Sequence, residues 1–398
     1  MQEQFGLFVH WGLYALTAYQ EQVRARLRLP RADYHRLMAE FNPVRYDPDV
    51  WVDLAWQAGM RCICFTAKHH DGFCLWDTRQ TDFNIMNTPY KRDVLRQLAD
   101  ACDRRGMKLS LYYSIPDWNH PNAYNPASSH QCPPEAGDQP DTVRYRAFLK
   151  EQIRELLTGY GPVYTLFWDI PPHIADPEIN AYVRSLQPGI LINDRGYDPG
   201  DFSTPERQVP DGAWFKRPTE ACQSVGRQSW GYRVLEDYYT TRYLTSSIDK
   251  VMAMGGSYLL NVGPMADGRI DPVSEEKVRV VGDWYNRIAE SLTEIEPISK
   301  QLTDSSSNQP FLAVARGSTW YLHFYDGLIA GGVTLKPVRE KPKDVILLNN
   351  GQPVDYAVTT LPTSWHWDTQ ELDPPYLHLF NLPAESLTHE PVVIKILW

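Results

Sequence analysis

Polar side chains that could do chemistry follow five short apolar runs in the first half of the chain. These side chains are His10, His69, His70, Tyr112, Asp169 and Arg195. If the runs are parallel strands of a β/α barrel, their carboxyl ends meet at one rim, so the six side chains converge there. Such a set offers hydrogen-bond donors and acceptors to a polyol, together with a carboxylate that can act as a nucleophile.

Cleavage of a glycosidic bond needs two carboxyl groups beside the anomeric carbon, about 5 to 5.5 Å apart when one of them is the nucleophile. Asp169 suits the nucleophile because it ends a strand, where aromatic neighbours fix its rotamer and Arg195 or a histidine can lower its pKa. The second group must carry a proton. Glu206 and Glu220 are the candidates, both in the Pro- and Gly-rich stretch 195–230, and the residues alone leave the choice between them open.

Each of these residues also has an ordinary structural use. Asp169 on its own could cap the following helix, because Asp is a favoured N-cap residue. His and Asp also bind zinc, but a barrel metallohydrolase presents an HxH pair on the first strand, and here that place reads His10-Trp11-Gly12. We therefore expect no metal and no other cofactor, and a metal-dependent barrel hydrolase is the less favoured alternative.

The elements that must position these side chains alternate between strand and helix. Short apolar runs predict the strands, and the segments between them show helical periodicity. The predicted strands are 5–9, 62–66, 108–112, 163–168, 190–193 and 257–262, and the clearest helices are 93–104, 142–157 and 275–292. This order is typical of βα units on a parallel sheet. The stretch 195–230 lacks a period and leaves barrel strands six and seven unmarked.

Beyond about Pro297 the helical period gives way to the alternation of antiparallel strands. Strands are predicted at 311–314, 320–325, 344–348 and 392–397, with turns between them. We therefore expect an α/β protein in which residues 1–297 form a (β/α)8-like TIM barrel and residues 298–398 form a β-sandwich domain.

Charge and hydropathy exclude several classes of partner. The 398 residues carry a formal net charge of -10, whereas a phosphate backbone needs clustered Lys and Arg. The basic cluster Arg24, Arg26, Arg28 and Arg31 is interpreted as a solvated face. There is no long apolar run and no leader pattern at Met1, so we expect no membrane partner and, for the sequence as given, a cytoplasmic location. A processed or trimmed secreted form is an open alternative.

In its motifs the chain resembles the α-L-fucosidases of glycoside hydrolase family 29, from Phe5 to about Pro272. The similar segments are, in order, FGLFVHWGLYAL, TAKHHDGFCLWDT, LSLYYSIPDW, LFWD, INDRG, GDFSTPE, SWGYR and GGSYLLNVGPMADG. Their order and spacing together make the resemblance specific. It implies a retaining glycosidase on a β/α-like barrel with a C-terminal β-sandwich, and no requirement for a metal.

The resemblance also implies roles for particular residues. By matching position Asp169 is the nucleophile and Glu206, in the Thr-Pro-Glu match, is the acid/base, with Glu220 as the alternative. The implied fucose-binding residues are His10, Glu21, His69, His70, Tyr112, Phe167 and Arg195. The chain departs from the family at Gln22, where the family has Trp, and at the aromatic position two residues before the nucleophile, which is Phe167 here.

The expected partner is a fucosylated oligosaccharide or glycoconjugate. Its 6-methyl group needs an apolar patch, for which Phe167, Trp11 and Trp230 are candidates. The linkage preference, the natural substrate and the oligomeric state stay open. A non-catalytic sugar-binding protein on the same barrel is a further alternative.

Overall fold

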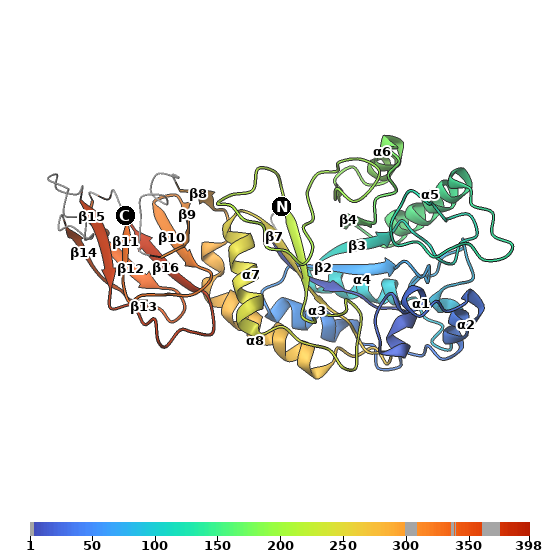
Figure 1. The fold of residues 1–398 in the computed structure, drawn as a ribbon, viewed down its shortest axis with the longest axis horizontal. Helices are drawn as coiled ribbons and strands as arrows, with labels where there is room; N and C mark the ends of the chain where they lie inside the picture. The colour runs from blue at the N-terminus through green and yellow to red at the C-terminus, as the bar shows by residue number, and fades with distance from the viewer. Residues whose placement is uncertain (1–3, 299–308, 336–337, 339, 360–374) are drawn as a thin grey trace.

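The computed structural model describes residues 4–298, 309–335, 338, 340–359 and 375–398. A parallel sheet with its helices forms one end of the elongated molecule, and antiparallel sheets form the other (Figure 1). Helices α7 and α8 lie between these two parts.

The parallel sheet has seven strands in the order β5-β4-β3-β2-β1-β7-β6. The strands are β1 (Phe5–Val9), β2 (Cys62–Lys68), β3 (Lys108–Ser114), β4 (Val163–Asp169), β5 (Leu191–Ile192), β6 (Glu220–Ser224) and β7 (Ser257–Val262). All neighbouring pairs are parallel, as the alternation of strands and helices predicts.

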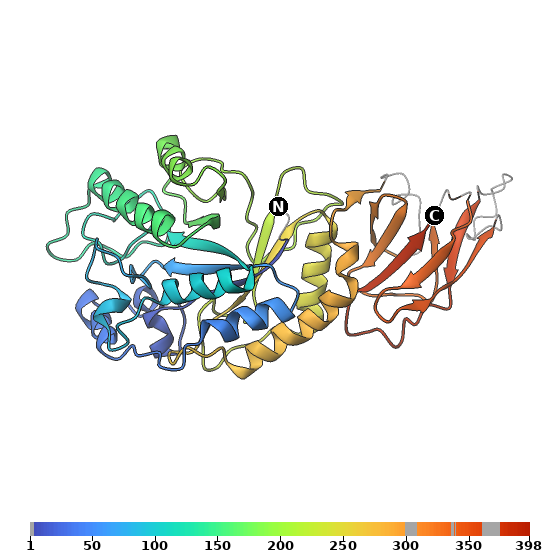
Figure 2. The same ribbon diagram turned by 180° about the vertical axis from the view of Figure 1, so that it is seen from behind.

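Helices connect the strands and cover the outside of the sheet (Figure 2). The longer ones are α3 (Pro48–Gln57), α4 (Val94–Arg105), α5 (Thr142–Gly159), α6 (Pro177–Leu186), α7 (Thr241–Ala253) and α8 (Pro272–Ile288). Shorter ones are α1 (Val23–Arg26), α2 (Arg31–His35), η1 (Leu13–Thr17), η2 (Arg36–Ala39), η3 (Ile85–Asn87) and η4 (Ala289–Ser291). The three predicted helices match α4, α5 and α8, each of which begins after an Asp whose side chain accepts hydrogen bonds from the first turn: Asp93, Asp141 and Asp271.

The edges of the sheet, β5 and β6, meet through an irregular segment, residues 202–206, which we call the seam. Three isolated parallel bridges join it to its neighbours: Asn193 with Phe202, Ser203 with Thr219, and Glu206 with Cys222. Pro205 lies inside the seam and has no N–H to give to a strand ladder. The structure therefore has a curled parallel sheet of seven regular strands whose edges are bridged by the seam, and the expected eight-stranded barrel stays a prediction.

The sequence did not mark β6, because Glu220–Ser224 reads EACQS and has none of the β-branched or aromatic residues that favour strands. β6 pairs with β7 and with the seam because the fold brings these segments beside it, not because its residues favour a strand. The amide of Glu220 donates to the carbonyl of Ser203 over 2.8 Å, and the amide of Cys222 donates to that of Pro205 over 3.1 Å.

Two antiparallel sheets form the C-terminal part, in agreement with the predicted all-β domain. One has the order β13-β12-β16-β10-β9-β8 and the other β11-β15-β14. The strands are β8 (Glu296–Pro297), β9 (Leu312–Arg316), β10 (Thr319–Phe324), β11 (Val333–Leu335), β12 (Asp344–Leu347), β13 (Gln352–Pro353), β14 (Asp355–Thr359), β15 (Tyr376–Phe380) and β16 (Val392–Leu397). Buried side chains of both sheets, such as Leu322 and Leu379, share one apolar core. The boundary after residue 297 stays a prediction.

The C-terminal sheets pack against the helical part through β9 and β10, which contact α7. Val314 and Tyr321 belong to the same apolar cluster as the core of the parallel sheet. At the contact, Nδ1 of His323 lies 2.8 Å from Oδ1 of Asp249, and both side chains are fully buried.

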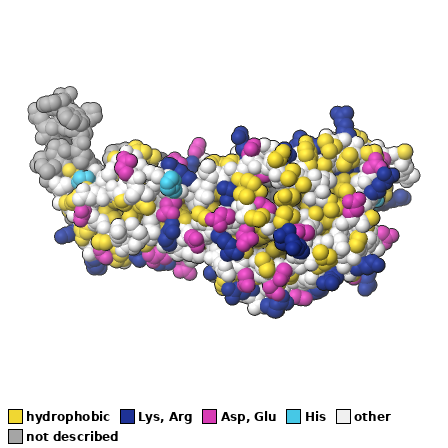
Figure 3. All heavy atoms as spheres, turned by 90° about the horizontal axis from the view of Figure 1, so that it is seen from below, with side chains coloured by type: hydrophobic (Ala, Val, Ile, Leu, Met, Phe, Trp, Pro, Cys, Tyr) yellow, Lys and Arg dark blue, Asp and Glu magenta, His cyan; other side chains and the backbone are white. Residues whose placement is uncertain are grey.

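On the face drawn in Figure 3, the described Lys and Arg side chains are interspersed with Asp and Glu. That face therefore presents charges of both signs rather than one broad basic surface. Within the described residues, no helix combines the length and the apolar character that crossing a bilayer requires.

Candidate active site

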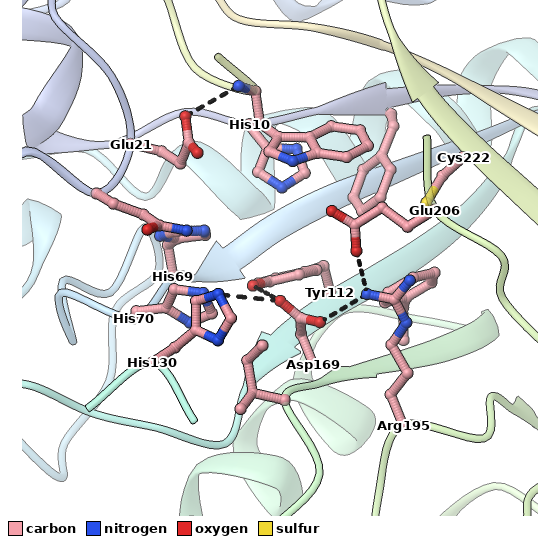
Figure 4. Close-up of a pocket in the computed structure, with 15 residues that line it drawn as sticks. His10, Glu21, His69, His70, Tyr112, His130, Asp169, Arg195, Glu206 and Cys222 are labelled. Atoms are coloured by element: carbon pink, nitrogen blue, oxygen red, sulfur yellow. Dashed lines mark hydrogen bonds and ion pairs between the residues drawn. The ribbon is translucent and has the colours of Figure 1, made fainter. Parts of the chain in front are cut away.

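A pocket of about 130 Å³ lies beyond the carboxyl ends of the parallel strands. Its walls include nine of the predicted site residues, many of which are labelled in Figure 4: His10, Glu21, His69, His70, Tyr112, Phe167, Asp169, Arg195 and Glu206. The remaining wall residues are Phe8, Gln22, His130, Ile170, Cys222 and Trp230. The rim predicted from separate strand ends is thus one continuous site.

The sheet register sets the relative height of the central side chains. Tyr112 pairs with Phe167, and Ser114 pairs with Asp169. Tyr112 and Phe167 therefore point into the barrel at one level, and their rings stack with centroids 5.9 Å apart. Phe8 joins them in a small apolar cluster. The three rings form an apolar part of the pocket wall.

Asp169 is held by two hydrogen bonds. The Tyr112 hydroxyl donates to Oδ2 over 2.7 Å, and Nη1 of Arg195 donates to Oδ1 over 3.0 Å. Burial alone raises the pKa of Asp169, but the charge of Arg195, the neighbouring His70 with Nε2 3.8 Å from Oδ2, and these hydrogen bonds together outweigh burial and lower it. Asp169 is therefore an ionised carboxylate in a fixed orientation at neutral pH.

Arg195 joins the two carboxylates of the site, as the dashed lines in Figure 4 show. The same Nη1 that contacts Asp169 donates to Oε2 of Glu206 over 2.6 Å. The two carboxylate oxygens are therefore at most about 5.6 Å apart. The guanidinium is itself fixed by Thr204, whose hydroxyl and carbonyl accept from Nε and Nη2 at 2.8 and 2.7 Å.

The tautomers of two pocket histidines follow from their partners. Nδ1 of His70 lies 2.7 Å from Oγ of Ser114, whose own proton goes to the carbonyl of Pro116. Nδ1 of His10 lies 2.7 Å from Oδ1 of Asn261. Both Nδ1 atoms therefore donate, which leaves Nε2 as an acceptor in the neutral ring.

Burial keeps these rings neutral. It lowers the pKa of His10, and it lowers the pKa of His70 to about 4. The pKa of His69 is also well below its ordinary value, because of burial and the neighbouring His70. At neutral pH His10 and His70 thus offer Nε2 lone pairs, which suit the hydroxyl protons of a polyol.

Glu21 lies on the opposite side of the pocket from Arg195 (Figure 4). Its Oε2 accepts from the hydroxyl of Ser229 over 2.8 Å and from the amides of Trp230 and Gly231 over 2.9 and 3.2 Å. These bonds fix the plane of the carboxylate and tie the loop after β6 to the loop after β1. Trp230 is thereby held at the pocket wall, where its ring stacks on His10.

His130 and Ile170 belong to the wall but were not predicted. His130 comes from the stretch 119–139, which shows no readable pattern, and its carbonyl accepts from Nε1 of Trp118. Ile170 follows Asp169 directly and has a positive φ of 62°, unusual for a β-branched residue. Adjacency to Asp169 was the signal that could have found Ile170, whereas the sequence offered none for His130.

The four arginines of the basic cluster were predicted to form a solvated face, but not all of them are exposed to solvent. Arg24 is buried, with 3% of its side chain exposed, and its guanidinium contacts Glu135 over 2.8 Å and the carbonyl of Trp118. Arg31 pairs with Asp138 over 2.6 Å. These arginines anchor the long loop that carries His130, because both partner carboxylates lie in it.

Two predicted placements are wrong. Glu220 does not lie on a loop over the pocket but begins β6 inside the barrel, where it is buried and is not among the pocket residues. Trp11, a candidate for the methyl patch, lies in the main core against Trp51, and its Nε1 donates to the carbonyl of Met265. Phe167 and Trp230 do line the pocket.

Glu220 makes stability depend on pH. Burial raises its pKa to about 8, whereas an unfolded Glu titrates near 4.3. The folded state therefore holds this proton more tightly than the unfolded state does. The contribution of Glu220 to the free energy of unfolding is complete below about pH 4 and is lost as the pH rises to 8. Between pH 5 and pH 8 the loss is up to roughly 4 kcal/mol.

We expect Glu220→Gln to remove that pH dependence. Urea unfolding at pH 5 and pH 8 should show a smaller decline for the variant than for the parent chain. Glu40→Gln, a change at an exposed carboxylate, is the control and should keep the parent slope. Equal slopes for Glu220→Gln and the parent would show that Glu220 is not a buried neutral acid.

Comparison with known proteins identifies the family of this chain. The family model described as "Alpha-L-fucosidase" matches residues 1–290. α-L-Fucosidase isoenzyme 1 from Paenibacillus thiaminolyticus is 31% identical, with a TM-score of 0.83 over 100% of this chain and 97% of that one. Plasma α-L-fucosidase from Rattus norvegicus is 25% identical over 92% of this chain and 89% of its own length.

A third relative shares the fold at lower identity. It is a family 29 α-L-fucosidase from Bacteroides thetaiotaomicron, solved as a trapped covalent intermediate with 2-fluoro-fucosyl fluoride. It is 22% identical and has a TM-score of 0.79 over 99% of this chain and 94% of that one. Since the family model spans most of the sequence, the chain belongs to the α-L-fucosidase family of glycoside hydrolases.

Proposed function

We propose that this α-L-fucosidase is a retaining exo-enzyme that removes terminal α-L-fucosyl residues by double displacement. The main support for this proposal is that Nη1 of Arg195 contacts both Asp169 and Glu206. This shared contact limits the distance between the two carboxylate oxygens to at most about 5.6 Å. That limit suits retaining glycosidases, whose two carboxyl groups are about 5 to 5.5 Å apart.

In the first step the ionised Asp169 attacks the anomeric carbon while Glu206 gives its proton to the departing oxygen. The bond to the leaving group breaks and a covalent fucosyl-enzyme forms. In the second step Glu206 takes a proton from water, the water oxygen attacks the anomeric carbon, and Asp169 leaves. Two inversions keep the configuration. The covalent intermediate trapped in the Bacteroides relative supports this course.

The contact of Glu206 with Arg195 suits the carboxylate form that the second step needs. In the first step Glu206 must instead be protonated, so it has to exchange Arg195 for the glycosidic oxygen. Its side chain is 38% exposed at the mouth of the pocket, whereas that of Asp169 is 12% exposed. The more exposed carboxyl is thus the one that can change partner and protonation between the two steps.

The remaining wall residues suit the groups of a fucose ring. The acceptor nitrogens of His10 and His70 face ring hydroxyls, and Glu21 provides a fixed acceptor beside them. Phe167 and Trp230 provide apolar surface for the 6-methyl group. The site is a small pocket rather than a long cleft, which favours a terminal residue of a fucosylated oligosaccharide or glycoconjugate.

Proton NMR during hydrolysis of an aryl α-L-fucoside tests this proposal. The first free sugar observed should be α-L-fucose, which then mutarotates, and EDTA should leave the rate unchanged. Appearance of β-L-fucose first would show inversion and contradict the double displacement. Loss of activity in EDTA that zinc restores would support the metal-dependent alternative, and sugar binding without turnover would support the non-catalytic one.

A further inference from the structure

Arg207 directly follows Glu206 and closes the seam, yet no step of the proposed mechanism uses it. Its backbone is in the left-handed region, with a φ of 51°. Non-glycine residues adopt that conformation rarely, and it persists where the surroundings fix it. The contacts of Arg207 therefore show which segments fix the conformation of this part of the chain.

Arg207 contacts three different segments. Its amide donates to the carbonyl of Cys222 on β6 over 3.0 Å. Its Nη1 donates to the carbonyls of Gly226 and Arg227 over 3.2 and 2.9 Å. The guanidinium carbon lies 4.4 Å from the ring centroid of Trp230. One side chain thus links the seam to the loop after β6 and to the pocket wall.

Trp230 is itself a fixed point. Its amide donates to Glu21, and its carbonyl accepts from Nδ2 of Asn261 over 2.8 Å. Its ring stacks on His10 with centroids 5.2 Å apart. Arg207 therefore connects the segment that carries Glu206 to the part of the wall that contacts the sugar in the proposed mode of binding.

We propose that Arg207 is a positioning residue that holds Glu206 at the glycosidic oxygen, an inference that rests on the proposed acid/base role of Glu206. Backbone hydrogen bonds join the seam to β6 at Ser203, Pro205 and Arg207, but no regular strand ladder runs along it, so side-chain contacts add to what fixes its position. Arg195 fixes it from one side through Thr204, and Arg207 fixes it from the other through Trp230.

The proposal also explains why this position is an arginine. A planar guanidinium can donate to two carbonyls while its face lies on an aromatic ring, whereas a lysine ammonium is a compact point charge. Arg207→Lys should therefore recover part of the function that Arg207→Ala loses. Loss of the anchor should displace Glu206 more than it disturbs Asp169, which lies on the regular strand β4.

The dependence of the rate on the leaving group tests this role. A phenyl α-L-fucoside needs protonation of its departing oxygen, whereas a dinitrophenyl α-L-fucoside needs little. For Arg207→Ala we expect kcat/KM toward the phenyl fucoside to fall roughly 10- to 100-fold, as a misplaced catalytic group does, with little change toward the dinitrophenyl fucoside. Arg227→Ala, which alters an exposed arginine in the adjacent loop, is the matched control and should behave like the parent.

Two outcomes would overturn the inference about Arg207 and leave the proposed function intact. Equal loss on both substrates would mean that Arg207 supports the whole pocket, and unchanged kinetics would mean that Glu206 needs no such anchor. Glu206→Ala, measured in parallel, separates these results from failure of the proposed function. If that variant shows no dependence on the leaving group, or if the parent chain cleaves no fucoside, the acid/base assignment fails and the inference fails with it.

Discussion

Asp169→Ala should lower kcat/KM toward an aryl α-L-fucoside by roughly 10⁴-fold or more, the scale seen when a covalent nucleophile is removed. In the proposed mechanism Asp169 supplies both the attacking oxygen and the negative charge that stabilises the oxocarbenium-like transition state. Steady-state kinetics with a dinitrophenyl fucoside will measure the loss most clearly, since that substrate needs the least help from an acid.

Azide identifies the cause of the loss. In the space left by the Asp169 side chain, azide can attack the anomeric carbon from the same face, so Asp169→Ala with azide should yield β-L-fucosyl azide. The variant should keep the fold, because Arg195 retains its bond to Glu206. Asp211→Asn, at a fully exposed carboxylate, serves as the control and should keep the parent rate. A near-normal rate for a folded Asp169→Ala would refute the assignment.

Glu206→Ala should lower the rate on a phenyl fucoside by about 10²- to 10⁴-fold, the usual contribution of general acid-base catalysis. On a dinitrophenyl fucoside the covalent intermediate still forms, but water lacks its base, so the intermediate accumulates. Azide needs no base and should restore turnover, giving α-L-fucosyl azide with retained configuration. Product analysis by NMR distinguishes this azide from that of Asp169→Ala.

Glu220→Ala decides between the two candidate acids. Because Glu220 is buried at the start of β6, we expect Glu220→Ala to change the stability of the fold. Azide should not change the rate at which this variant cleaves an aryl fucoside. Azide rescue of Glu220→Ala, together with no rescue of Glu206→Ala, would reverse the assignment.

The sequence predicts the half of the site that regular strands build. His10, Tyr112 and Asp169 end or follow apolar runs, and parallel strands bring such ends to one rim whatever the details of packing. The strand ends alone could therefore place Asp169 and the histidines at one rim, whereas the role of Asp169 as nucleophile is a prediction that the family resemblance implies. The structure adds the tautomers and the shared contacts of Arg195, which depend on partners far apart in the chain.

The rest of the site depends on tertiary contacts that leave no local pattern. β6 lacks strand-forming residues and pairs because β7 and the seam lie beside it. His130 reaches the pocket because Arg24 and Arg31 anchor its loop from another part of the chain. Trp11 was misplaced because adjacency to His10 does not tell which way a side chain points.

The seam also has a consequence for how this barrel tolerates change. A strand inside a ladder shares its amides with two neighbours, so an insertion there shifts the register of the whole sheet. The seam is joined to its neighbours by single bridges rather than by a continuous ladder. A longer or shorter loop before or after it therefore leaves the other strands in place. The proposed acid/base residue therefore lies where insertions in the chain have a low structural cost, while the proposed nucleophile lies at the end of a strand inside the regular sheet.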